Sequence, residues 1–105
     1  MKATRLVLLL AIVAMVLAPL AAVAADGAAV YKAKCASCHG PDGKGETSIG
    51  KSMKLKSLAS AEVQKTTEAD LTKIITDGKG KMPAYKGKLS ADEIKALVAY
   101  IRTLK

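Results

Sequence analysis

The chain has 105 residues, enough for one domain at most, and its 17 basic and 9 acidic residues give a formal net charge of +8. It contains three tyrosines but neither phenylalanine nor tryptophan. This composition excludes an aromatic platform for nucleic-acid bases, so nucleic acid is not expected as a partner. It also leaves a small apolar core, which needs a covalent staple, a metal or a large buried cofactor to be stable.

Residues 1–25 have the layout of a secretory signal peptide. A short basic start is followed by a continuous apolar run over residues 6–17, by a proline and by small residues up to Ala25. Cleavage after Ala24 or Ala25 would release a mature chain that starts at Ala25 or Asp26, with its domain at residues 26–105, into the periplasm with no stable membrane insertion. The alternative is an uncleaved anchor, because the apolar stretch is long enough to span a bilayer.

Residues 27–37 are predicted to form the first helix of the mature domain. The segment is rich in Ala and Lys, and Gly27, Val30 and Tyr31 share one helical face. A run of glycine and proline turn residues over 40–45 follows it. The helix therefore ends at the start of a loop.

Cys35, Cys38 and His39 form a C-x-x-C-H run at the end of this helix, and they are the only cysteines and the only histidine in the chain. Thiols three residues apart on a helical turn point to the same side, so both can add to the vinyl groups on one edge of a porphyrin. The adjacent imidazole can then ligate the iron. The motif therefore predicts one covalently bound haem c, with Cys35, Cys38 and His39 as binding residues.

Two other chemistries use a C-x-x-C pair. A thiol–disulfide redox pair usually lies in a thioredoxin-type strand–helix context, and none is visible here. A zinc site needs four ligands, but no Cys or His remains after these three residues. Haem attachment is therefore favoured over both.

The rest of the mature domain is predicted to be loops and helices without strands. Residues 40–56 form a predicted loop, and residues 58–65 a short helix. A third helix begins at an N-cap, Thr67, and ends at Gly78. A second loop covers residues 79–89.

A capping box beginning at Ser90, with Glu93 three residues on, starts the last predicted helix. Arg102 and Lys105 near its end suit the negative end of the helix dipole. One face of this helix carries an apolar stripe, made of Ile94, Leu97, Val98, Ile101 and Leu104. The fold class is therefore all-α.

A haem held by one histidine leaves the opposite face of the iron open unless a second ligand closes it. The mature domain has two methionines, Met53 and Met82. Met82 lies in the loop 79–89, where a lid over the face opposite His39 is expected, and Pro83 stiffens this loop. Thioether sulfur is a soft ligand that favours ferrous iron. Met82 is therefore the predicted second axial ligand, and Met53 is the alternative.

Together these features resemble the class I cytochrome c family in its small bacterial and algal form. The run from Cys35 to His39 matches the family's haem-binding signature, and the run from Met82 to Tyr85 is similar to its axial-methionine loop. Two residue pairs are similar to those at the crossing of the family's first and last helices: Gly27 with Tyr31, and Leu97 with Tyr100.

The resemblance implies a class I cytochrome c fold, with about four short helices and loops wrapped around one covalently bound haem. It implies thioether bonds from Cys35 and Cys38, and axial ligation of the iron by His39 and Met82. Many relatives also have a proline carbonyl that accepts a hydrogen bond from the ligand histidine, but no proline occurs here between Lys44 and Met82. A carbonyl around residues 50–55 is expected to orient the imidazole instead.

Lysines are concentrated in the segments expected to surround the haem: Lys34, Lys44, Lys51, Lys54, Lys56, Lys79, Lys81, Lys86 and Lys88. A positive collar of this kind would steer redox partner proteins with acidic docking surfaces. The expected function is that of a monomeric periplasmic electron carrier, not an enzyme. The alternatives are a haem-based ligand-binding or sensory protein in which the methionine dissociates, and a haem-free thiol oxidoreductase.

Overall fold

The structure is a computed structural model that describes residues 25–105. The predicted signal peptide therefore lies almost entirely outside the described residues. Six helices occur in this part of the chain, and their bounds are α2 (Gly27–Lys34), α3 (Ala36–His39), α4 (Ser48–Ser52), α5 (Ala61–Lys65), α6 (Glu68–Asp77) and α7 (Ala91–Arg102). Between residues 25 and 105 there is no strand, only two isolated bridges in the loop before α7. None of these helices has the length and apolarity to cross a membrane.

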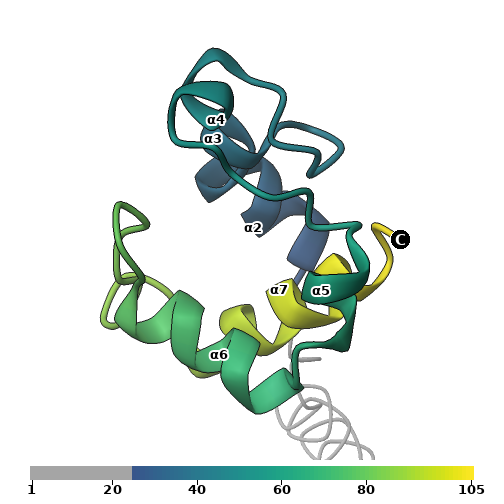
Figure 1. Cartoon of the computed structure of the whole chain (residues 1–105). Coiled ribbons are helices and arrows are strands. Elements are labelled where there is room, and N and C mark those ends of the chain that lie inside the picture. The colour runs from purple at the N-terminus through teal and green to yellow at the C-terminus, as the bar shows by residue number, and fades with distance from the viewer. Residues whose placement is uncertain (1–24) are drawn as a thin grey trace, which may run out of the picture.

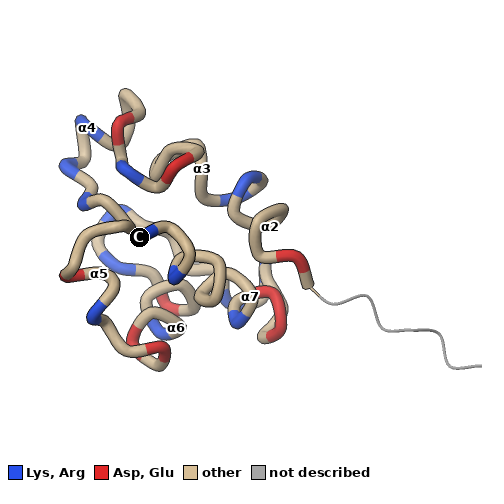
Figure 2. The backbone as a smooth tube through the Cα atoms, turned by 90° about the vertical axis from the view of Figure 1, so that its right-hand side faces the viewer, with Lys and Arg blue, Asp and Glu red and all other residues tan. Residues whose placement is uncertain are grey.

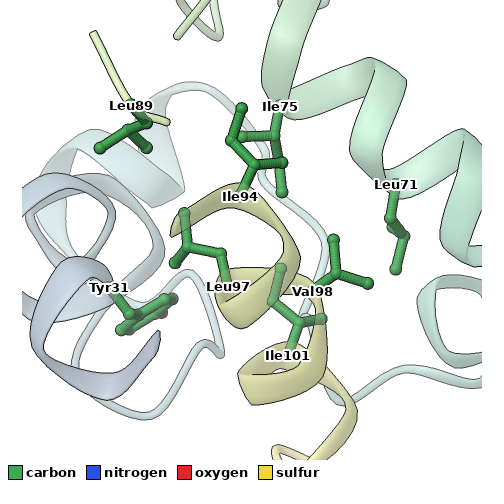
Figure 3. Close-up of a cluster of buried hydrophobic side chains, with 8 residues drawn as sticks. All are labelled: Tyr31, Leu71, Ile75, Leu89, Ile94, Leu97, Val98 and Ile101. Atoms are coloured by element: carbon green, nitrogen blue, oxygen red, sulfur yellow. The ribbon is translucent and has the colours of Figure 1, made fainter. Parts of the chain in front are cut away.

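Helix α7 joins the two halves of the domain. The first half contains α2, α3 and α4, and the second contains α5 and α6; α7 contacts both α2 and α6 (Figure 1). The predicted apolar stripe of α7 is confirmed for Ile94, Leu97, Val98 and Ile101, which are buried, whereas Leu104 lies beyond the end of α7 and is only partly buried. In Figure 3 these side chains lie between Tyr31 of α2 and the two buried side chains of α6, which are Leu71 and Ile75.

The crossing of α2 and α7 requires glycine at position 27. A Cβ built on Gly27 would lie 2.2 Å from the carbonyl oxygen of Ala96, so any side chain there would push the helices apart. One turn later, the ring of Tyr31 packs against that of Tyr100, with ring centroids 5.0 Å apart. The Tyr31 hydroxyl donates to the carbonyl of Gly40 at 2.6 Å, which fixes the turn after α3 to α2.

The first predicted helix, residues 27–37, is wrong at its C-terminal end. Helix α2 stops at Lys34, and α3 begins after an interruption at Cys35. The N–H of Cys38 donates to the Cys35 carbonyl three residues back, as in the tighter 3₁₀ turn. The carbonyl of Lys34 accepts a hydrogen bond from a distant side chain, the hydroxyl of Tyr85. A long-range contact therefore accompanies the end of this helix.

Helix α4 lies inside the predicted loop 40–56, so that prediction is also wrong in part. Thr47 caps α4 by accepting from the N–H of Gly50, and its hydroxyl donates to the Cys38 carbonyl at 2.6 Å. The predicted caps at Thr67 and Ser90 are confirmed, and Ser90 forms the full capping box with Glu93.

Replacing Gly27 with Ala should destabilise the folded protein by about 2 kcal/mol, because the added methyl group meets helix backbone that cannot rotate away. Chemical denaturation of the haem-loaded protein would measure this. Ala28→Ser is the matched control, since it adds one heavy atom to the same turn at an exposed position and should change the free energy of unfolding by less than about 0.5 kcal/mol. Equal stability of the two variants would contradict the close crossing.

Candidate haem-binding site

A cavity of about 610 Å³ lies between the two halves of the domain. Cys35 and His39 line it from the first half, and Met82 lines it from the loop that follows α6. Leu97 and Ile101 of α7 contribute apolar surface where the halves meet. The volume falls within the usual range for a cofactor pocket, which is roughly 300–1,000 Å³.

The structure therefore brings together residues that are more than forty positions apart in the sequence. Cys35 and His39 line the cavity, whereas Cys38 is half-buried on the same turn outside the lining. Both methionines also line the cavity, Met82 from the loop after α6 and Met53 from the end of α4. The cavity lining by itself admits either sulfur as the second ligand.

The chemistry of the cysteines opposes the thiol oxidoreductase alternative. Burial, with a smaller contribution from the nearby Cys38, raises the pKa of Cys35 to about 11. A redox-active C-x-x-C pair instead relies on a thiol whose pKa is lowered. Residues 25–105 hold no cluster of three or more potential metal-binding Cys, His, Asp or Glu side chains.

The imidazole of His39 is half-buried, and burial lowers its pKa, which favours the neutral form that ligates iron. Its Nδ1 atom is buried and has no hydrogen-bond partner in the described part of the chain. The expected acceptor, a carbonyl within residues 50–55, is therefore not found. The carbonyl of Gly50 accepts from the N–H of Leu55 instead.

The loop that carries Met82 is held against the end of α6. Lys79 and Met82 exchange backbone hydrogen bonds of 3.2 and 2.9 Å. Gly78 has a positive φ of 76°, and a Cβ there would lie 2.7 Å from the Met82 carbonyl. The N–H of Tyr85 donates to the Ile75 carbonyl at 3.0 Å. These contacts fix the backbone of the loop relative to α6.

A network around Arg102 holds α5, and the sequence analysis missed it. The guanidinium of Arg102 donates to the carbonyls of Val63, Gln64 and Thr66 at the end of α5. The side-chain amide of Gln64 donates to the carbonyls of Leu58 and Ile101. Arg102 is the only arginine after the predicted signal peptide, and its several donors suit a cluster of carbonyls. This single arginine was the one feature of the sequence that could have predicted the network.

Four lysines line the cavity, and they are Lys54, Lys56, Lys79 and Lys81. The only acidic residue in the lining, Glu62, pairs with Lys56 at 2.6 Å. Both partners of this pair are largely exposed, so it contributes little to stability. The Lys56 hydrogen bond and charge lower the pKa of Glu62. The rim of the cavity is therefore predominantly positive.

These features fit haem. The volume suffices, the walls are largely apolar, and the imidazole of His39 and the thioether of Met82 line the cavity from different halves of the domain. The thiol of Cys35 lies at the cavity wall beside His39, where it could form a thioether bond.

Comparison with known proteins agrees with this fit. The sequence profile of the family described as "Cytochrome C oxidase, cbb3-type, subunit III" matches residues 22–101. Cytochrome c6 of Leptolyngbya boryana is 41% identical over 78 residues, which cover 74% of this chain and 88% of that protein. Cytochrome c6 of Microcystis aeruginosa is 40% identical over 76 residues, or 72% and 90% of the two chains.

Two further related proteins differ in how much of their own length this chain covers. The cbb3-type cytochrome c oxidase subunit FixP of Azorhizobium caulinodans is 39% identical over 83 residues, which cover 77% of this chain but only 27% of that longer protein. The solved structure of the KustC0563 c-type cytochrome superposes with a TM-score of 0.71 at 36% identity, covering 76% of this chain and 98% of the other.

The fold and the site thus define an all-α domain of the c-type cytochrome class. The chain belongs to the cytochrome c family, as a small class I member. It accordingly binds haem c covalently, with iron as the metal, and it is an electron carrier rather than an enzyme.

Replacing Arg102 with Ala should lower the free energy of unfolding by about 2–3 kcal/mol, because three carbonyls lose a charged donor. Urea denaturation of the haem-loaded protein would measure the loss. Lys105→Ala, which removes a positive charge from an exposed site three residues away, should have little effect. If the Arg102 variant were as stable as the Lys105 variant, the network would not hold α5.

Proposed function

We propose that this protein is a periplasmic carrier of single electrons, with haem c attached to Cys35 and Cys38 and ligated by His39 and Met82. The observation that carries the proposal is the position of His39 and Met82 on different halves of the domain and around one cavity. The haem iron supplies the chemistry, since it takes up and releases one electron. The protein supplies the two ligands and keeps the site largely apolar.

The loop geometry favours Met82 over Met53 as the second ligand. Met82 stands in a segment whose backbone is fixed to α6, opposite the half that carries His39. Met53 instead follows α4, which packs against α3 on the same half as His39. Ligands on opposite faces of a haem have to approach from different sides. A ligand pair of His39 and Met82 meets this requirement directly.

The ligand assignment can be tested by replacing each methionine with Ala. Met82→Ala should abolish the weak far-red absorption band that marks methionine-ligated ferric haem, because the sulfur is lost. Met53→Ala is the matched control and should keep the band, since both changes remove a half-buried methionine side chain from the cavity wall. Survival of the band in the Met82 variant and its loss in the Met53 variant would reverse the assignment.

The charge around the cavity supports acidic redox proteins as partners. The lysines of the rim are exposed, and Figure 2 shows basic residues on α4 and along the chain that leads from it to α5. A rim with four lysines and one carboxylate attracts anions and speeds their approach at low ionic strength. We expect the protein to act as a monomer that meets such partners transiently.

Electron transfer with ferricyanide, a small anionic oxidant, tests this rim. Lys81→Glu should slow the second-order rate by roughly threefold at low salt and should weaken its dependence on ionic strength. Lys95→Glu makes the same change of charge at an exposed site on α7 outside the cavity lining, and should affect the rate less. Equal effects of the two variants would mean that net charge alone steers the anion.

Export is part of the same proposal. Removal of residues 1–24 or 1–25 would leave the described domain with 15 basic and 9 acidic residues, a net charge of +6 before haem is counted. The intact mass of protein isolated from a periplasmic fraction would identify the cleavage position. A mass that includes the N-terminal segment would favour an anchor instead.

A further inference from the structure

The Met82 loop and the haem-attachment motif belong to different halves of the domain. The loop over residues 78–89 is bound to α6 by backbone hydrogen bonds, among them Lys86 N–H to the Thr76 carbonyl at 3.1 Å. The motif is bound instead to α2 and α4, through the contacts of Tyr31 and Thr47. Helix α7 contacts both halves (Figure 1), and its residues Leu97 and Ile101 line the cavity. A separate contact is required to hold the loop 78–89 against the first half of the domain.

One side chain makes that contact. The hydroxyl of Tyr85 donates to the carbonyl of Lys34 at 3.0 Å, across 51 positions in the sequence. Among the hydrogen bonds found within residues 25–105, it alone joins the loop 78–89 to the half that contains α2, α3 and α4. Its two ends lie three residues after Met82 and one residue before Cys35.

The contact suits a fixed spacer. Lys34 is the last residue of α2, and carbonyls in the last turn of a helix lack an intrahelical donor. The ring of Tyr85 is half-buried against the apolar core, and its N–H and carbonyl are bonded within the second half, to Ile75 and Leu89. Because the backbone of Tyr85 is bonded to the second half and its hydroxyl to the first, the side chain sets a distance between the two halves.

We propose that Tyr85 is a positioning residue, whose hydrogen bond to Lys34 holds the Met82 loop against the haem-attachment motif and so keeps Met82 on the iron when outside ligands compete. This proposal rests on the ligation by His39 and Met82 proposed above. Tyr85 itself acts only through the loop. Its loss should make displacement of Met82 easier without removing the ligand.

The test is the binding of imidazole to the oxidised, haem-loaded protein, followed by the visible spectrum at fixed temperature. Imidazole has to displace Met82, so weaker loop attachment should tighten imidazole binding. Tyr85→Phe removes only the hydroxyl and should tighten it roughly two- to fivefold, the effect of one partly exposed hydrogen bond. The far-red methionine band should remain in the absence of imidazole.

Two controls separate positioning from general loosening. Tyr100→Phe removes the hydroxyl of another half-buried tyrosine and should leave imidazole affinity unchanged, since no hydrogen bond of that hydroxyl is found within residues 25–105. Ser90→Ala removes the cap of α7 and should lower the melting temperature while leaving imidazole affinity unchanged. Affinity in Tyr85→Phe equal to that of the wild type, or an equal gain in Ser90→Ala, would overturn the proposal.

The same measurements distinguish the two proposals. If the wild-type spectrum lacks the methionine band, ligation by Met82 fails, and the role of Tyr85 fails with it. If the band is present and disappears in Met82→Ala, but Tyr85→Phe binds imidazole like the wild type, only the role of Tyr85 is overturned. Tighter binding in Tyr85→Phe alone supports both.

Discussion

The packing of α7 against both α2 and α6 is the contact on which the site depends. Gly27 allows the backbones of α2 and α7 to pack in direct contact. This contact fixes the position of the half that carries His39 relative to α7. Leu71 and Ile75 place the second half against the same helix. The cavity is the space left between these halves, so the α7 contacts set its width. Loss of either contact would move His39 away from Met82.

The composition explains why a protein of this size contains such a large cavity. Tyr31 and seven aliphatic residues make up the buried core, and no phenylalanine or tryptophan is available to fill the centre. Haem c is a large, flat and mostly apolar group, and when bound it supplies the volume that side chains do not. Helix caps and the Arg102 network hold the surrounding walls. Bound haem and the buried side chains would therefore form a single apolar core.

The sequence predicted the local determinants of this structure and, through the family resemblance, the crossing of α2 and α7, but it did not predict several other long-range contacts. The caps at Thr67 and Ser90 and the stripe on α7 depend on residues within two turns of each other, and their prediction was confirmed. The interruption of the first helix at Cys35 and the role of Arg102 involve partners more than 35 positions away. Helix α4 was missed because glycine and lysine suggested a loop, although Thr47 offered a cap. The acceptor for His39 was expected at a carbonyl around residues 50–55, in place of the proline carbonyl that many relatives have, and no partner for its Nδ1 is found within residues 25–105.

The central claim is that the two halves present His39 and Met82 to opposite faces of one haem. NMR of the reduced, haem-loaded protein with ¹³C-labelled methionine methyl groups tests it most directly, because the haem ring current moves the signal of a ligating methyl group far upfield. The account predicts one strongly shifted methyl signal, assigned to Met82 by its absence from Met82→Ala, and an ordinary signal for Met53. A shifted signal that belongs to Met53, or no shifted signal at all, would contradict it.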